Sequence, residues 1–245
     1  MLKLPFFLAA SLGLLSQSTL HAEGSVSISV APATLSTSVT AQMFSPTSEL
    51  TPRSAGNDIS LDASSIQFAL GTQYIREFSG NYRLIFALTG GYGKHKKTLT
   101  LSTMDDQKAD AGSYTLETGA FMDISVGAGT WFGDWMPSMH AGVSFGKIKQ
   151  SVTPKAIENE DKDEAQSFSK WRPGFFFQLG LTKAFGDSKS WYALMCYKRT
   201  SYASTRSTWK TELGDGLGSS VTADGIANAI TPTVHSLHFG IARRF

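Results

Sequence analysis

Apolar residues alternate with small or polar residues at every second position along most of this chain. Between residues 66 and 78, one face carries Ile66, Phe68, Leu70, Thr72, Tyr74, Arg76 and Phe78. A period of two places successive side chains on opposite sides of a β-strand. Because the same pattern returns in the segments that follow, the chain is predicted to be all-β.

The alternation predicts eight strands. The next apolar faces carry Tyr82, Leu84, Phe86, Leu88, Gly90 and Tyr92; Tyr114, Leu116, Ala120, Met122, Ile124, Val126 and Phe132; Met139, Ala141, Val143 and Phe145; and Phe175, Phe177, Leu179, Leu181 and Phe185. In the seventh strand, around residues 191–205, we favour Trp191, Ala193, Met195 and Tyr197 on the apolar face with Lys198 opposite, and the reverse register stays open. In the first strand, between residues 25 and 44, the alternation changes phase at Pro32, which predicts a β-bulge there.

Short turns and long connections alternate strictly along the chain. The turns fall at 79–81, 133–135 and 186–190, and the long polar connections near 45–63, 102–112, 154–168 and 211–232. This arrangement is typical of outer-membrane barrels, which have short periplasmic turns and long extracellular loops. The predicted fold class is a transmembrane antiparallel up-and-down β-barrel of eight strands, with both chain ends on the periplasmic side.

The positions of the aromatic residues favour this barrel over its main rival, a soluble lipocalin-like barrel with its apolar face turned inward around a ligand. One set lies near the short turns: Tyr82, Trp131, Phe132, Trp135, Phe185, Trp191 and Tyr192. A second set, Tyr92, Tyr114 and Trp171, lies about 9–11 tilted residues away, the length that crosses a bilayer. We therefore expect two aromatic girdles and apolar faces that contact lipid.

Residues 1–22 have the features of a secretory signal peptide, with an early lysine, an apolar run over residues 4–15 and small or polar residues up to Ala22. We predict cleavage after Ala22, which leaves residues 23–245 as one outer-membrane β-barrel domain of a Gram-negative bacterium. The single cysteine, Cys196, has no disulfide partner. A formal net charge of +2 provides no basic field for nucleic acid.

The chain ends on an aromatic residue in the middle of an alternating pattern. Leu237, Phe239, Ile241 and Phe245 share one face, with Arg243 where an apolar residue is usual. In this the chain resembles the small eight-stranded outer-membrane barrels of the OmpA and OmpX type, whose members end on an aromatic residue that the barrel assembly machinery reads. The resemblance covers nearly all of residues 23–245 as a pattern. It implies that these four apolar residues form the assembly signal.

An eight-stranded barrel is just wide enough for its own side chains to fill it, so a general diffusion pore is not expected. The inward faces supply acids and bases that we expect to interlock as ion pairs and hydrogen bonds. This predicted interior network comprises Glu77, Arg83, Glu117, Asp123, His140, Arg172, Lys198, His238 and Arg244. It favours a structural polar core, with a narrow gated, porin-like channel as the alternative.

Some eight-stranded outer-membrane barrels modify lipid A, and the deacylases among them use a His-x-Ser pair on a late strand. Here the seventh strand has no histidine between Cys196 and Tyr202. His235 and Ser236 are adjacent, so they point to opposite sides of the sheet. We therefore expect no enzyme activity, no cofactor and no metal, and a lipid A-modifying enzyme is the second alternative.

Three segments in the predicted connections suggest how the surface interacts. Residues 154–164 are densely acidic, but their spacing matches no calcium loop, which favours a solvated loop over a Ca²⁺ site. The run Lys94-His95-Lys96-Lys97 would lie at the outer lip, as a contact for lipopolysaccharide phosphates or as an ordinary charged rim. Residues 212–232 are rich in glycine and small residues and are expected to form a flexible loop.

These features together predict a structural or surface-interaction, adhesin-like role through the extracellular loops. The expected partners are outer-membrane lipid and lipopolysaccharide, the barrel assembly machinery, and a host or surface ligand at the loops.

Overall fold

The computed structural model describes residues 22–44, 59–79, 81–102, 110–154, 166–186, 189–214 and 220–245. Within these stretches the strands are β1 (Ala22–Phe44), β2 (Ile59–Ser79), β3 (Tyr82–Gly93), β4 (Lys96–Ser102), β5 (Asp110–Thr130), β6 (Trp135–Pro154), β7 (Gln166–Phe185), β8 (Trp191–Tyr202), β9 (Thr205–Gly214) and β10 (Ser220–Arg244). No helix in the described stretches is long and apolar enough to cross a membrane. The predicted signal peptide lies outside the described residues except for Ala22, with which β1 begins.

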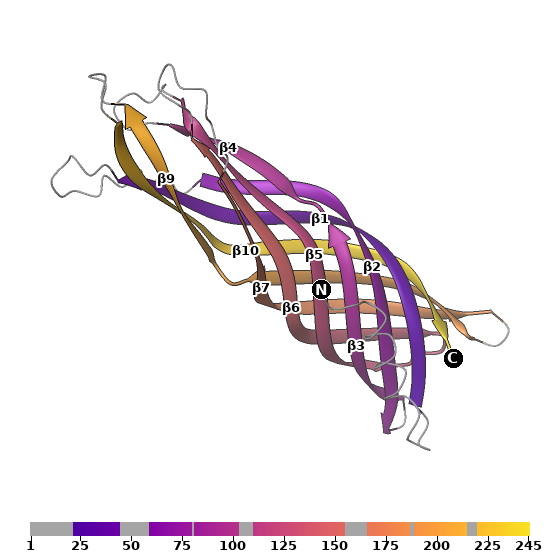
Figure 1. The fold of residues 1–245 in the computed structure, drawn as a ribbon. Coiled ribbons are helices and arrows are strands. Elements are labelled where there is room, and N and C mark those ends of the chain that lie inside the picture. The colour runs from indigo at the N-terminus through magenta and orange to yellow at the C-terminus, as the bar shows by residue number, and fades with distance from the viewer. Residues whose placement is uncertain are drawn as a thin grey trace.

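These elements form one closed antiparallel barrel with eight strands in the ring. β3 and β4 are two parts of one strand, interrupted at Lys94 and His95, and both pair with β5. β8 and β9 are two parts of another, interrupted at Ala203 and Ser204, and both pair with β10. The ring order is β1-β2-β3-β5-β6-β7-β8-β10, and β10 pairs with β1 to close it (Figure 1). The predicted eight-stranded up-and-down barrel is confirmed.

The last residues of the chain complete the ring beside the beginning of β1. Ile241 pairs with Ile28, and the backbone N–H of Phe245 donates to the carbonyl oxygen of Gly24 at 3.0 Å. The alternating C-terminal pattern is therefore the second half of the β1–β10 pairing.

Short turns join β2 to β3, β5 to β6 and β7 to β8, as predicted. Gly133 and Gly186 have φ angles of 62° and 82°, a left-handed conformation that glycine adopts at little cost. An ion pair of 2.7 Å between Lys189 Nζ and Asp134 Oδ1 links two of these turns. The short-turn end of the barrel is thus tied together by its connections.

The prediction of a flexible loop over residues 212–232 is wrong. β9 runs to Gly214, β10 begins at Ser220, and the two pair without a register shift down to Ala229 and Thr205. Most residues of this hairpin are small or polar, and the larger apolar residues of β10, Val221, Ile226 and Ile230, fall at both odd and even positions. The sequence therefore shows no continuous apolar face there that could reveal a strand. The connections at 45–58, 103–109 and 155–165, including the acidic residues 155–164, lie outside the described residues.

Large apolar side chains cover the outside of the barrel near the short turns, and we call this part the membrane barrel. Ile28 and Phe68, on neighbouring strands, are 59 % and 62 % exposed. Other exposed members of this belt are Val26, Val30, Ile66, Leu70, Phe86, Ile124, Val126, Met139, Phe175, Phe177, Leu179, Met195, Leu237, Phe239 and Ile241. An apolar outer surface suits a barrel surrounded by lipid, and the lipocalin-like alternative does not fit it.

Farther from the short turns, the apolar face changes from the outside of the barrel to the inside. In β1 the even-numbered residues from Val26 to Ser38 point outward, so Ile28 is exposed whereas Leu35 is completely buried inside. Pairing of β1 with β2 continues unbroken through Pro32. The register shift of β1 lies instead between Ser36 and Ser38, opposite β10. The predicted bulge at Pro32 is wrong, because the change of hydrophobic phase marks a change of surroundings and not of backbone.

A bulge in β5 corrects a second prediction. The sequence analysis places Tyr114 and Leu116 on the lipid-facing side with Ile124, but both are buried inside the barrel. The register of β5 with β6 shifts between Thr118 and Phe121, which reverses the two faces of the outer part of the strand.

Three of the predicted girdle residues lie inside the barrel. Tyr114 belongs to the outer core, while Trp131 and Tyr192 pack near the short turns with ring centroids 6.0 Å apart. The exposed large aromatic residues of the two predicted girdles are Tyr82, Phe132, Trp135, Phe185 and Trp191 near the turns, and Tyr92 and Trp171 at the other edge of the belt.

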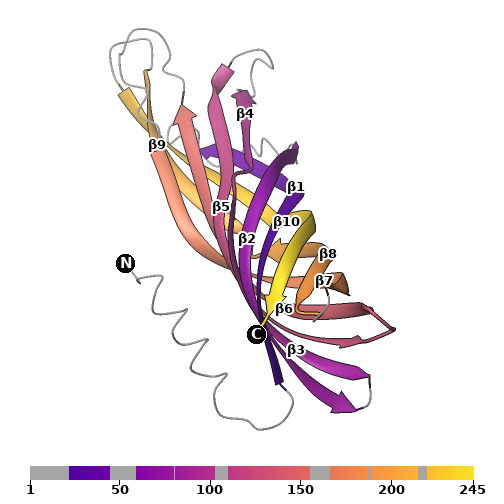
Figure 2. The ribbon, with the colours of Figure 1, turned by 90° about the vertical axis from the view of Figure 1, so that its right-hand side faces the viewer.

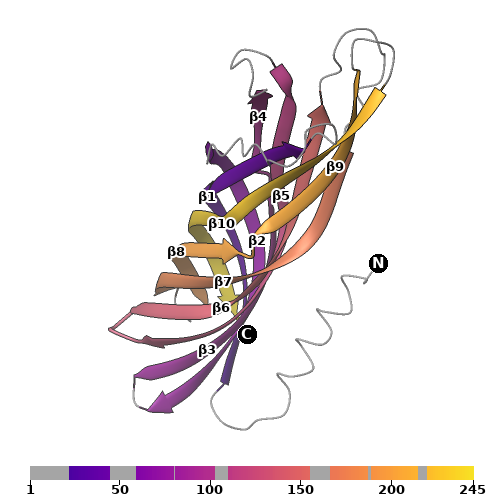
Figure 3. The ribbon, with the colours of Figure 1, turned by 90° about the vertical axis from the view of Figure 1, so that its left-hand side faces the viewer.

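Beyond the belt the ring opens into two facing sheets, which we call the outer sandwich. Pairing of β2 with β3 ends at Gln67 and Gly93, and pairing of β7 with β8 ends at Gly174 and Tyr202. The described pairings leave a sheet of β4, β5, β6 and β7 opposite a sheet of β2, β1, β10 and β9. In Figures 2 and 3, β4 and β9 stand on opposite sides of this outer end. The core between the sheets comprises Ala33, Leu35, Val39, Leu61, Ala63, Tyr114, Leu116, Ile148, Val152, Tyr202, Ala229 and Val234.

Candidate functional site

The interior of the membrane barrel is polar and contains one deeply buried ion pair. Lys198 Nζ, from β8, donates a hydrogen bond to Asp123 Oδ2, from β5, and both side chains are 6 % exposed. The same ammonium lies 4.8 Å from the ring centroid of Phe121 and 4.7 Å from that of Phe176. Cation–π attraction and the carboxylate together compensate the lost hydration of this lysine. The pair connects two strands that β6 and β7 separate in the ring.

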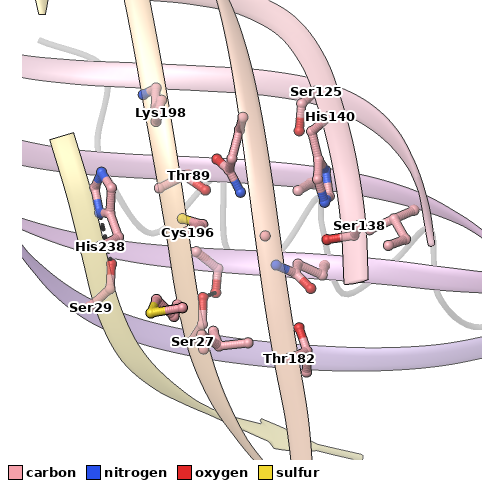
Figure 4. A pocket seen from close by; sticks show the side chains of 18 of the residues that line it. Ser27, Ser29, Thr89, Ser125, Ser138, His140, Thr182, Cys196, Lys198 and His238 are labelled. Carbon is pink, nitrogen blue, oxygen red and sulfur yellow. Dashed lines mark hydrogen bonds between the residues drawn. The ribbon is translucent and has the colours of Figure 1, made fainter. Parts of the chain in front are cut away.

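His238 joins the last strand to the first within the same interior. Its Nδ1 lies 3.3 Å from Ser29 Oγ (Figure 4). Its Nε2 lies 3.0 Å from Ser236 Oγ. His140 also points inward, but its buried Nδ1 has no hydrogen-bond partner among the described residues. A Cβ at Gly127 would lie only 2.5 Å from that nitrogen, so a glycine on the neighbouring strand gives the imidazole its space.

A cavity of about 70 Å³ lies among these side chains. Hydroxyl, amide and charged groups line it, including Ser138, Gln178 and Lys198 (Figure 4). A polar cavity of this size has room for a few ordered waters, which would serve the unpaired Asp123 Oδ1 and His140 Nδ1. It is a small enclosed space among side chains and not a wide passage.

Apolar layers lie on both sides of this polar interior. On the outer side is the sandwich core, in which Tyr114, Leu116 and Val152 are completely buried. On the short-turn side, Met136 packs with Ile75, Ile85 and Trp131. An ion moving along the barrel axis would have to cross both layers without its hydration.

The nine residues of the predicted network do not form one interior cluster. Asp123, His140, Lys198 and His238 lie inside the membrane barrel. The other five residues form separate pairs or stand apart, near the two ends of the barrel.

Three of the predicted charges form two ion pairs at the short-turn end. Arg83 lies 3.6 Å from Glu77, and Arg244 lies 2.7 Å from Glu23. These pairs are partly exposed and stand at the mouth of the barrel rather than within it.

Glu117 and Arg172 lie at the outer end. Glu117 points outward and lies 3.6 Å from Lys94 Nζ, so its predicted interior position is wrong for the reason that applies to Leu116, the bulge in β5. Arg172 points inward from β7, but it lines a separate cavity where β7 and β9 part.

Sequence reasoning missed the partners of these groups. Ser29 reaches His238 only because β1 and β10 are neighbours in the closed ring, whereas Ser236 lies two residues before His238 on the same face of β10. Phe121 lies on the same face of β5 as Asp123. The alternation predicts that Ser29 and Phe176 point into the barrel. It does not predict which strands lie across the interior from them.

The residues weighed for lipid A chemistry are held apart. His235 points outward, where its Nδ1 lies 2.7 Å from the hydroxyl oxygen of Tyr197, while Ser236 is buried inside. Cys196 is a free cysteine. Among the described residues, no group of three or more His, Cys, Asp or Glu side chains is gathered as for a metal ion.

The basic run at the outer lip divides into two environments. Lys94, Lys96 and Lys97 are exposed, whereas His95 is completely buried at the interruption between β3 and β4. Its Nδ1 lies 2.8 Å from Thr118 Oγ1, and its carbonyl oxygen accepts the Thr118 N–H at 2.9 Å. Burial lowers the pKa of His95, an effect that backbone carbonyls of Ala33 and Gly93 partly oppose. His95 is therefore a structural residue beside three surface lysines.

No known protein family and no characterised protein sequence matches the chain. Among solved structures, the outer membrane protease OmpT of Escherichia coli is similar with a TM-score of 0.50 and 10 % identity, over 94 % of this chain and 100 % of that one. OprG of Pseudomonas aeruginosa gives a TM-score of 0.45 and 11 % identity, over 92 % and 98 % of the two chains. Ail, the attachment invasion locus protein of Yersinia pestis, gives 0.37 and 13 %, over 91 % and 99 %.

At these identities the likeness to OmpT shows a shared fold and nothing about activity. The closed eight-stranded ring and its exposed apolar belt agree with that fold. The chain is an outer-membrane β-barrel.

Proposed function

We propose that this outer-membrane β-barrel is a closed, non-conducting protein that holds the outer sandwich and its loops at the cell surface for interaction. The observation that carries the proposal is the apolar core of the outer sandwich, which stands directly over the polar interior. Opening a path would require the separation of Tyr114 and Leu116 from their neighbours and rupture of the Asp123–Lys198 pair. Both changes are costly in a low-dielectric interior.

Planar-bilayer recording of the folded full-length chain tests the closed state. We expect no unitary currents at any voltage. Reproducible single-channel steps would overturn the proposal, and their loss in Asp123→Asn would place the path through the interior.

The interaction role rests on a rigid scaffold that carries several connections beyond the membrane, the usual position of binding residues. Cells that display the protein should attach to host cells or matrix more than cells that display a variant with residues 45–58 and 155–165 replaced by short Gly-Ser linkers. Equal attachment at equal surface abundance would contradict this role.

Exposed Lys94, Lys96 and Lys97 support lipopolysaccharide as a partner, since they lie just beyond the outer edge of the apolar belt. Retention of lipopolysaccharide on the detergent-extracted protein should fall when the three lysines are changed to Gln, and should fall for the natural chain as salt rises. Retention unchanged by either treatment would contradict the contact.

The barrel assembly machinery is the partner we propose for the C-terminal strand, where Phe245 is 63 % exposed. Phe245→Asp should lower the amount of folded protein in the outer membrane, with Phe132→Asp, at an exposed aromatic in a turn, as the matched control. Equal losses in the two variants would speak against a specific terminal signal.

The proposed role includes no catalysis, no cofactor and no nucleic acid. Its support is that His235 and Ser236 occupy opposite faces of β10. Mass spectrometry of lipid A from cells with and without the protein should give identical acyl chains, and a difference would establish an enzyme instead.

A further inference from the structure

A cavity opens in the barrel wall where β7 and β9 part. The last bond between these segments is donated by the N–H of Ala203 to the carbonyl oxygen of Pro173, at 2.9 Å. Beyond it, β7 pairs only with β6, and β9 pairs only with β10. The gap contains a cavity of about 130 Å³, larger than the cavity of the polar interior.

Cationic side chains dominate the lining of this cavity. Lys170 and Arg172 come from β7 and Arg206 from β9, and no carboxylate is among the described residues that line the cavity. None of the three makes an ion pair with a described residue, and the buried Nε of Arg172 has no hydrogen-bond partner. Within the part of the chain that the structure describes, no acidic partner offsets these three positive charges, and their mutual repulsion beside one cavity would be relieved by an anion.

Neutral hydrogen-bonding groups and the apolar side chains of Ile148 and Phe168 line the rest of the cavity. Thr205 and Thr208 come from β9 and Gln150 from β6. Gln150 Nε2 donates to Thr205 Oγ1, which ties β6 to β9 at the base of the gap. The walls of the cavity are therefore fixed by three strands and by the hydrogen bond between Gln150 and Thr205, and not only by exposed side chains.

The cavity lies at the level of the outer lipid headgroups. Trp171, next to Arg172, points outward, is 55 % exposed and belongs to the outer edge of the apolar belt. Phe175 lies four residues farther along β7 on the same face, closer to the membrane centre, and is 77 % exposed. Phosphate groups of the outer leaflet occupy this depth.

We propose that the cavity between β7 and β9 binds a phosphate group, with Arg172, Arg206 and Lys170 as its cationic ligands. Guanidinium groups match phosphate oxygens with paired N–H donors, and threonine hydroxyls can donate as well. The phosphate belongs either to the headgroup of a membrane lipid such as lipid A or to a small phosphorylated solute. The proposal rests on the outer-membrane fold and not on the closed state or the loop interactions.

The first arm tests the site with inorganic phosphate. Isothermal titration of the detergent-folded full-length chain at low salt should show saturable binding, and Arg172→Gln with Arg206→Gln should weaken it by about tenfold or more. Lys147→Gln with Lys149→Gln is the matched control, because these lysines are exposed on the outer face of β6 and do not line the cavity between β7 and β9. This control should bind within about twofold of the natural chain, since it removes the same charge from outside the site.

The second arm identifies the source of the phosphate. The natural chain in nanodiscs that contain lipid A should retain lipid A through detergent exchange, and the arginine pair variant should lose it. Binding of inorganic phosphate without lipid A retention would assign the site to a soluble phosphate compound. The single variant Arg206→Gln, at an exposed position, keeps the test valid if the pair variant fails to fold.

Absence of saturable phosphate binding in the natural chain would overturn the proposal. Equal weakening in the arginine pair and lysine pair variants would also overturn it, since only the general positive charge of the outer rim would then matter.

Discussion

Lys198 is the side chain on which the polar interior depends most, because it pairs with Asp123 and lies against two aromatic rings. Removal of one partner from a buried pair leaves the other charge without compensation. Lys198→Met should therefore lower the free energy of unfolding by about 3–5 kcal/mol. Urea unfolding of the protein in lipid vesicles measures this change.

Two further variants isolate the charge effect of Lys198. The double change Asp123→Leu with Lys198→Met should recover most of the loss, since it leaves no buried charge. Lys189→Met, which breaks the exposed pair with Asp134, should leave stability unchanged. A Lys198→Met protein as stable as the natural chain would show that the interior is hydrated enough to accept a lone carboxylate.

His95 makes one junction of the outer sandwich sensitive to acid. Burial places its folded pKa below the unfolded value of about 6.5. Its contribution to stability is therefore complete above that pH and is lost as the pH falls through the window below it. Hydrogen exchange at the Thr118 amide, which bonds to the His95 carbonyl, should quicken between about pH 6.5 and pH 5 beyond the intrinsic pH effect.

Asparagine at position 95 keeps a polar atom near Thr118 but cannot titrate. The His95→Asn protein should lack the extra acceleration. The same acceleration in both proteins would assign the acid sensitivity to another group.

At the scale of the element, the long strands change partners along their length. β1 has 23 residues and β10 has 25, whereas about 9–11 tilted residues cross a bilayer. The remainder stands in water, where an apolar face must turn inward. This accounts for Ile28 outside and Leu35 inside on one continuous strand.

The free-energy cost of an arginine on the outward face of β1 should therefore depend on the depth of that position in the membrane. Ile28→Arg should cost about 2–4 kcal/mol, as for a cation deep in the lipid face of a barrel. Ser38→Arg, on the same face but beyond the belt, should cost little. Equal costs in vesicle-folding titrations would mean that both positions meet the same solvent.

Sequence reasoning found the ring of strands, the short turns and the lipid-facing residues, because lipid demands a continuous apolar face. It failed at Pro32, on the outer margin of the belt beside Ile66, and it failed beyond the belt in the outer part of β5 and along the β9–β10 hairpin. At those places the assumption that one face stays apolar along a whole strand does not hold. The cavity between β7 and β9 could not be predicted from the sequence either. Arg172 and Arg206 line it together only because these two strands separate there.

The whole molecule combines two barrel parts with opposite polarity on one set of strands. The membrane barrel has an apolar outside and a polar inside, and the outer sandwich has the reverse. Closure of β10 on β1 leaves no strand edge unpaired within the belt, where each bare backbone group would cost several kcal/mol.

Such closure predicts resistance to detergent. The folded protein should migrate differently on a semi-native gel before and after boiling. Identical migration, together with a water-soluble protein, would contradict a closed membrane barrel.

The central claim is the reversal of the apolar face between the two parts, and site-directed spin labelling tests it most directly. Single cysteines would be placed at outward positions 28, 68 and 241 in the belt and 34, 38 and 149 beyond it, in a Cys196→Ser background, and labelled in lipid vesicles. We predict preferential access of oxygen to the first three labels and of a water-soluble nickel reagent to the last three. Equal access of the nickel reagent to all six labels would contradict the account.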